Sequence, residues 1–139
     1  MKSKIFALLL VALLPLTACS QSLEKQVLGA WKGEVKNSFL ETMQMKTVFI
    51  TDKTIDLGDG LPPQPVTLLS QDNSVLVQIT GNTLSLIPSA LTLSDNETLI
   101  ISFPGGTSWK LGRTTETDIQ TIRAEQKKKS DQARKDFLK

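Results

Sequence analysis

The sequence predicts a mainly β protein, a small antiparallel meander of about eight short strands closed into a barrel or folded into a sandwich, with a polar C-terminal α-helix. Three observations predict this fold class. Between residues 30 and 113, apolar residues recur at every second position and turn signals interrupt them at short intervals. The last 21 residues contain neither Gly nor Pro. A chain of 139 residues has room for one such domain.

The chain begins with a segment that resembles an export signal rather than part of the fold. Lys2 and Lys4 precede twelve mostly apolar residues, 5–16, and small residues follow before Cys19. A helix that spans a bilayer needs about 20 apolar residues, so this run is too short to cross one. We therefore expect residues 1–18 to be a signal peptide that is removed.

Residues 16–19, Leu-Thr-Ala-Cys, resemble the lipobox of bacterial lipoproteins. The resemblance implies cleavage before Cys19 and a diacylglycerol on its thiol, so that the protein is anchored by lipid. By the same resemblance, Ser20 rather than Asp after the cysteine implies the outer membrane, with the protein facing the periplasm. An ordinary secretory signal with a stray cysteine, or an uncleaved anchor, are the alternatives.

Removal of the signal leaves 121 residues with 14 basic and 14 acidic side chains, so the net charge of +2 belongs to the signal. Within the mature chain, residues 19–118 carry 7 basic and 11 acidic groups, and residues 119–139 carry 7 and 3. We expect a lipidated tether over 19–29, with one helical turn around Leu23, before an acidic body and a basic tail.

The β-domain is predicted over residues 30–113. Val75, Val77 and Ile79 alternate with polar or outward-facing neighbours, which is typical of a strand with one face on a core. Gly58 to Pro65 contains three prolines and is expected to form a stiff corner, with a binding lip as the alternative. The candidate strands are 30–36, 43–51, 54–57, 66–70, 74–80, 83–87, 91–93, 98–103 and 107–112.

The basic helix is predicted over residues 114–139. Thr115 and Asp118 have the spacing of a shortened capping box, and Thr117 or Asp118 can cap the helix that follows. A helix of about five turns is favoured from Ile119 onward. Its middle, residues 125–132, is wholly polar, so it cannot be a core element along its length. It projects into solvent, frays or lies on a partner.

The composition argues against catalysis. The chain has no His, which removes hydrolase triads and histidine-based metal sites. Asp56 and Asp59 form a close carboxylate pair, but both adjoin glycines in a turn, where Asp is favoured for backbone hydrogen bonding. No nucleophile or phosphate-binding motif is present in the sequence. We expect a non-enzyme with no catalytic residues, metal or cofactor.

Trp31 and Trp109 lie in the first and last candidate strands, and we expect both indoles to close one end of the core, with a ligand mouth as the alternative. The Gly29-Ala30-Trp31 segment and the segment from Trp109 to Arg113 resemble lipocalin-like barrels. The resemblance implies that Arg113 covers the indole of Trp31, that both residues are structural and that the interior can hold an apolar ligand.

The lysines Lys127, Lys128 and Lys129, with Arg123 and other basic residues of the tail, are candidates to contact an anionic lipid or acidic polymer. A solvated helix is the alternative, and nucleic acid is not expected as a partner. Together the sequence predicts a lipid-anchored envelope lipoprotein that acts as a non-catalytic interaction module toward an envelope protein or wall polymer. The alternative function is a lipocalin-like carrier of a lipid or another apolar small ligand.

Overall fold

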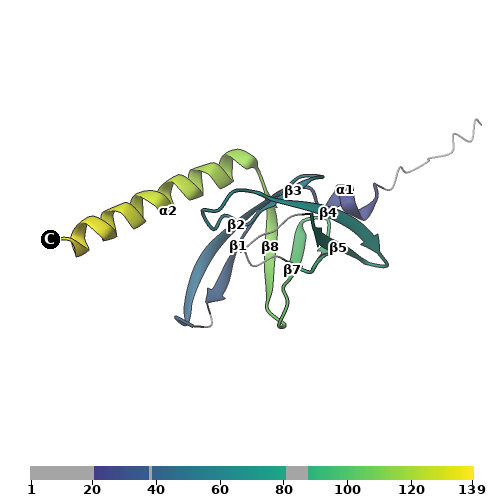
Figure 1. The fold of residues 1–139 in the computed structure, drawn as a ribbon, viewed down its shortest axis with the longest axis horizontal. Coiled ribbons are helices and arrows are strands. Elements are labelled where there is room, and N and C mark those ends of the chain that lie inside the picture. The colour runs from purple at the N-terminus through teal and green to yellow at the C-terminus, as the bar shows by residue number, and fades with distance from the viewer. Residues whose placement is uncertain (1–20, 38, 81–87) are drawn as a thin grey trace, which may run out of the picture.

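A computed structural model describes residues 21–37, 39–80 and 88–139 as a β-barrel with one long helix projecting from it (Figure 1). The short helix α1 (Leu23–Gln26) precedes the barrel and α2 (Glu116–Phe137) follows it. The strands of the described residues are β1 (Gly29–Asn37), β2 (Thr42–Ile50), β3 (Thr54–Asp56), β4 (Gln64–Gln71), β5 (Ser74–Ile79), β6 (Ala90–Asp95), β7 (Thr98–Ser102) and β8 (Ser108–Thr114).

Each strand pairs antiparallel with the next along the chain, and β8 pairs with β1 to close the barrel. The prediction of a small antiparallel meander with a C-terminal helix is confirmed, as a barrel and not a sandwich. Eight of the candidate strands agree with the observed bounds to within two residues. The remaining one, 83–87, lies outside the described residues.

The core lies inside the barrel and is formed by inward-facing residues at alternate positions. Leu99 and Ile101 are fully buried while their neighbours on β7 are partly exposed, as period-two alternation predicts. The alternation weakens along β5, where Val75 is buried but Ile79 is 47% exposed. The core cluster comprises Val27, Trp31, Val48, Ile50, Ile55, Leu57, Val66, Val75, Leu91, Leu99, Ile101, Phe103 and Leu111.

Trp31 is fully buried at the end of the barrel that α1 closes. Its indole Nε1–H donates to the carbonyl of Val27, which directly follows α1, at 2.9 Å. The guanidinium carbon of Arg113 lies 4.1 Å from the ring centre. The cover that the lipocalin resemblance implied for this indole is therefore present. Gly29 has φ of +111°, a backbone conformation that favours glycine, and brings the chain beneath Arg113.

Trp109 lies at a different level, so the prediction that both indoles close one end is wrong. Trp31 is paired with Arg113 across β1 and β8, whereas Trp109 faces Ile101 on β7, four residues before Arg113. The physical reason is that β1 and β8 pair only over Ala30–Lys32 and then separate. Trp109 precedes the residues of β8 that pair with β1, so it does not lie beside Trp31.

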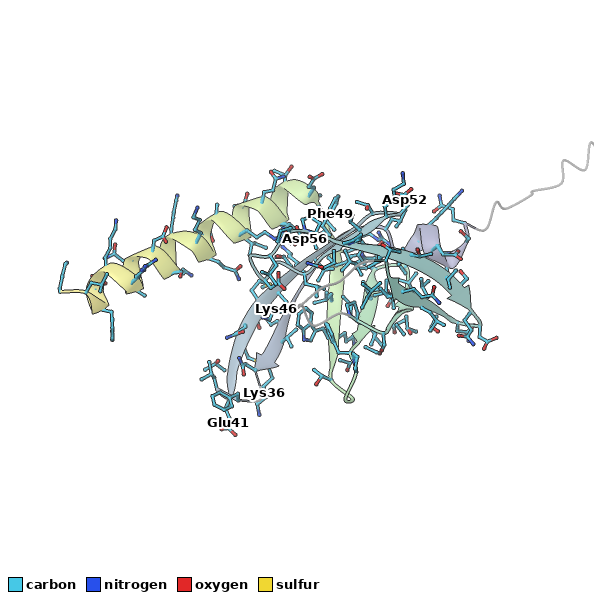
Figure 2. All side chains as sticks on the ribbon, in the orientation of Figure 1. Lys36, Glu41, Lys46, Phe49, Asp52 and Asp56 are labelled. Atoms are coloured by element: carbon cyan, nitrogen blue, oxygen red, sulfur yellow. The ribbon has the colours of Figure 1, made fainter. Side chains whose placement is uncertain are left out.

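The β1–β2 hairpin extends beyond the closed part of the barrel (Figure 2, where Lys36 and Glu41 mark its tip). Strand β2 pairs with β3 only at Phe49 and Ile50, so the outer edge of its first seven residues is not paired with β3. Gly33 lies where the hairpin leaves β8. A Cβ there would be 2.7 Å from the Lys110 carbonyl oxygen, so only glycine allows this approach.

Candidate interaction surface

The first turns of α2 hold the helix on the barrel. The Thr115 side chain accepts a hydrogen bond from the Asp118 amide at 3.2 Å, which confirms the spacing of the capping box. Thr115 is therefore the N-cap, and the prediction of Thr117 or Asp118 as the cap is wrong. The helix begins at Glu116 and not at Ile119, because this cap lies one residue before Glu116. Ile119 is the buried residue of α2, 1% exposed. The apolar anchor of the helix is thus Ile119 in its first turn, followed by the half-buried Ile122 in the next turn.

Two ion pairs fasten this part of α2. Lys32 on β1 pairs with Asp118, and the Thr114 hydroxyl donates to the same carboxylate oxygen at 2.5 Å. The hydrogen bond from Lys32, and then that from Thr114, lower the pKa of Asp118. One helical turn later, Arg123 pairs with Asp56 on β3 at 2.7 Å. Both pairs are partly exposed, so they orient the helix more than they stabilise it.

Arg123 also contacts Thr47, a buried polar residue that is 2% exposed. Its Nε donates to Thr47 Oγ1 at 2.9 Å, and the nearby Gly58 has no side chain to obstruct this contact. A Cβ on Gly58 would be 2.7 Å from the oxygens of Thr47. The sequence placed Arg123 in a free basic patch, and that placement is wrong because the side chain is engaged with the barrel.

After one further contact, made by Gln126, α2 leaves the barrel. Gln126 donates to the Met45 carbonyl on the outer edge of β2 at 2.9 Å. Every residue from Ala124 to Lys139 is exposed. Figure 1 shows the helix directed away from the barrel, with its C-terminus at the end of the molecule opposite α1. The helix therefore both docks, through its first turns, and projects, over the remainder.

Lys127, Lys128 and Lys129 are all exposed, but they do not form one patch. Consecutive helical residues point about 100° apart, so these three lysines lie on three sides of α2. Residues seven apart share a side, which places Arg134 with Lys127 and Lys135 with Lys128. The projecting helix thus presents positive charge on more than one side.

A groove of about 530 Å³ lies between α2 and the loop that joins β3 to β4. Lys127 and Ser130 line it from the helix, and Leu61 from the loop. The proline-containing loop joins β3 to β4, which pair with each other, so it is a hairpin connection within one closed barrel and not the expected corner between two sheet halves. The residues that line the groove are Asp56, Gly58, Asp59, Gly60, Leu61, Arg123, Gln126, Lys127 and Ser130.

The hairpin tip carries a second exposed group, which is apolar. Phe39 is 91% exposed, and Leu40 and Met43 are each 58% exposed. The Asn37 side chain accepts hydrogen bonds from the amides of Phe39 and Leu40, at 2.9 and 3.2 Å, and so fixes the turn. Their exposure is not evident from the sequence, because a strand-like apolar run does not reveal that its end leaves the barrel.

The predicted contact residues have different environments. Trp31 is fully buried, so its side chain is not accessible to a ligand or partner. Trp109 is half-buried, between the Phe103 ring, whose centre is 4.6 Å away, and the Lys46 ammonium at 5.4 Å. It lines a pocket of about 180 Å³ together with residues of the β1–β2 hairpin. Cys19, the predicted lipidation site, lies outside the described residues.

The carboxylates Asp56 and Asp59 accept hydrogen bonds from backbone amides of the loop between β3 and β4. Asp56 accepts from the Gly58 amide at 2.9 Å in addition to its ion pair, and Asp59 accepts from the Leu61 amide at 3.0 Å. The part of the chain that the structure describes contains no cluster of three or more acidic, Cys or His side chains suited to a metal. In the same part, no helix is long and apolar enough to cross a membrane.

Comparison of the chain with protein-family models, with curated proteins and with solved structures found no match.

Proposed function

We propose that this protein is a lipid-anchored lipoprotein of the outer membrane that faces the periplasm and acts as a non-catalytic interaction module. The observation that carries the proposal is the exposure of every residue of the chain from Ala124 onward. An isolated helix of this length is marginally stable in water and has little apolar surface to bury. Its exposed charges are available to a partner.

The position of the anchor supports the same role. Gln21, where the described chain begins, is two residues from Cys19, a reach of at most about 7 Å. The α1 end of the barrel is then next to the membrane, and α2 is directed away from it. At about 1.5 Å per residue, the 22 residues of α2 extend about 33 Å.

The charge of the tail indicates an acidic envelope protein or wall polymer as the partner. Residues 119–139 carry 7 basic and 3 acidic groups. The apolar hairpin tip at Phe39 adds a second contact surface, on a protrusion of its own.

The experiment places a photo-crosslinking amino acid at Lys128 on α2 and, as the matched control, at the exposed Lys53 on the barrel. Adducts in intact cells are expected at position 128 and not at 53. Replacement of Lys127 and Lys129 by Gln should reduce them at least fivefold. Adducts that are equal at both positions, or unaffected by the replacements, would refute the contact by α2. A Cys19→Ser variant that remains with the membrane fraction would refute the lipid anchor.

A carrier of a lipid or other apolar ligand is the second candidate function, supported by the closed barrel and by the pocket beside Trp109. That pocket, about 180 Å³, is smaller than the 300–1,000 Å³ of typical small-molecule sites, which favours the interaction module. Native mass spectrometry of protein purified from cells tests this candidate, because a carrier retains a bound ligand.

A further inference from the structure

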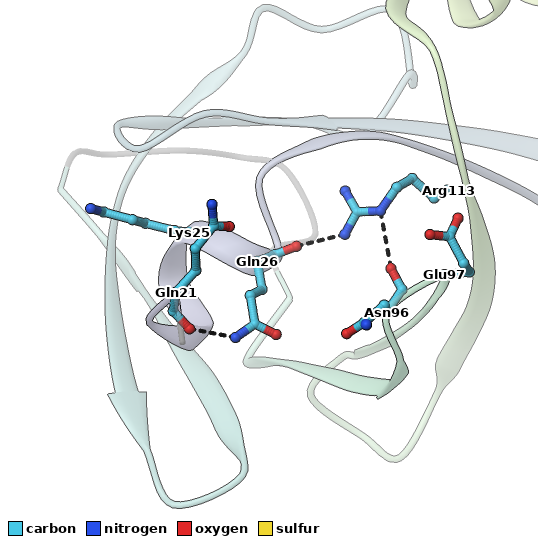
Figure 3. Close-up of a pocket in the computed structure, with 6 residues that line it drawn as sticks. All are labelled: Gln21, Lys25, Gln26, Asn96, Glu97 and Arg113. Carbon is cyan, nitrogen blue, oxygen red and sulfur yellow. Dashed lines mark hydrogen bonds between the residues drawn. The ribbon is translucent and has the colours of Figure 1, made fainter. Parts of the chain in front are cut away.

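A pocket of about 410 Å³ at the α1 end of the barrel is lined by polar residues (Figure 3). Arg113, whose guanidinium covers Trp31, lines the pocket. Gln21, the first residue that the structure describes, lines it as well. The lining residues are Gln21, Lys25, Gln26, Asn96, Glu97 and Arg113.

Arg113 is held in place at this pocket. Its Nε, Nη1 and Nη2 donate to the carbonyls of Asn96, Leu28 and Gln26 at 3.1, 3.2 and 2.8 Å. A guanidinium has five N–H groups, and within the part of the chain that the structure describes two of those of Arg113 have no hydrogen-bond partner. Its guanidinium carbon lies over the Trp31 ring, 4.1 Å from the ring centre. A fixed guanidinium with free donors is suited to a phosphate group.

Glu97 brings a negative charge to the same pocket. Its amide donates to Asp95 Oδ1 at 2.8 Å, and its carbonyl accepts from the Arg113 amide at 2.9 Å, so its backbone is fixed. Among the described residues, the ion pairs include neither Glu97 nor Arg113. The Lys25 ammonium points away from Arg113 (Figure 3). The lining therefore carries two cations, Lys25 and Arg113, and one anion, Glu97, and among the described residues Glu97 forms no ion pair with either cation.

We propose that this pocket binds the zwitterionic phosphoethanolamine headgroup of a membrane lipid, with the phosphate on Arg113 and the ammonium on Glu97. The inference rests on the proposed lipid anchor, because Cys19 is two residues from Gln21 and brings the pocket to the headgroup layer. The amides of Gln26 and Asn96, which also line the pocket, supply neutral donors and acceptors. The barrel is thereby oriented on the membrane, with α2 directed away from it.

The experiment uses the acylated protein in neutral detergent micelles. Glycerophosphoethanolamine is added while the emission of Trp31 is followed in a Trp109→Phe background, because the ligand would contact the guanidinium that rests on the Trp31 ring. A saturable change is expected. The trimethylammonium of glycerophosphocholine cannot donate hydrogen bonds to Glu97, so that compound should bind at least tenfold more weakly.

Variants separate recognition from folding. Glu97→Gln should weaken glycerophosphoethanolamine binding at least tenfold and weaken glycerophosphocholine binding less, because the trimethylammonium loses only a charge attraction and no hydrogen bond. Asn96→Ala retains the backbone carbonyl that holds Arg113 and should have a smaller effect. Equal binding of the two compounds, equal binding of inorganic phosphate, or an unaffected Glu97→Gln variant would overturn the proposal.

The soluble headgroup also separates this inference from the proposed function. If the Cys19→Ser variant leaves the membrane but the acylated protein shows no saturable change, the pocket proposal fails and the anchor stands. If the headgroup binds but the Cys19→Ser variant stays on the membrane, the anchor fails and the binding site stands.

Discussion

Replacement of Trp31 by Ala should destabilise the barrel more than any other single aromatic truncation in the described residues. The indole is fully buried, and truncation of a buried Trp costs about 3–5 kcal/mol. The lost hydrogen bond to the Val27 carbonyl adds about 1 kcal/mol, and the lost contact with Arg113 about 0.5–1 kcal/mol. The total is about 4.5–7 kcal/mol, a large share of the 5–15 kcal/mol that stabilises a typical domain.

The measurement is urea unfolding followed by far-ultraviolet circular dichroism, which does not depend on the indole that is removed. Trp31→Phe retains a ring but loses the N–H donor, so it should cost about 1–3 kcal/mol. Trp109→Ala, at a half-buried position, should cost about half as much as Trp31→Ala. A loss below about 1 kcal/mol for Trp31→Ala would show that the indole does not close the α1 end of the core.

Two further predictions concern the barrel wall and α1. Gly33→Ala should lower the free energy of unfolding by about 1–3 kcal/mol in the same assay, because its Cβ would be 2.7 Å from a backbone oxygen. In the control Gly112→Ala the nearest contact of the Cβ is 3.8 Å, so the free energy of unfolding should change by less than about 1 kcal/mol. Equal losses in the two variants would contradict this. Hydrogen bonds from Ser70 and backbone amides lower the pKa of Glu24 from 4.5 to about 2. The stability that this ionised group contributes is complete above pH 4.5 and is lost as the pH falls toward 2. The pH dependence of unfolding should therefore be shallower over this range in Glu24→Gln, and an unchanged profile would contradict the contact.

The sequence predicts the strands well because each has a local signature. Alternation on β7 and the turn residues between strands depend on neighbours along the chain, so the meander follows from short-range patterns. Its closure into a barrel does not, because β1 and β8 are far apart in the sequence and the same patterns also fit a sandwich. The cover of Trp31 by Arg113 was accessible only through resemblance, since 82 residues separate the two.

The surface was harder to predict, because charged residues carry no local signal of their partners. Arg123 and Lys127 look equivalent in the sequence, yet one is engaged by Asp56, 67 residues away, and the other is exposed. Glu97 and Arg113 share a pocket only because β8 returns beside the turn before β7. Long-range pairing therefore decides which charges are free.

The docked turns of α2 have a consequence for solubility. An unpaired strand edge is a template on which other chains can add strands. The side chains of Gln126 and Arg123 occupy the carbonyls of Met45 and Thr47 on the outer edge of β2, where a neighbouring strand would otherwise bond. The helix thus shields a site of potential aggregation. A chain that ended before Thr115 would keep its eight strands but expose that edge to other copies of itself.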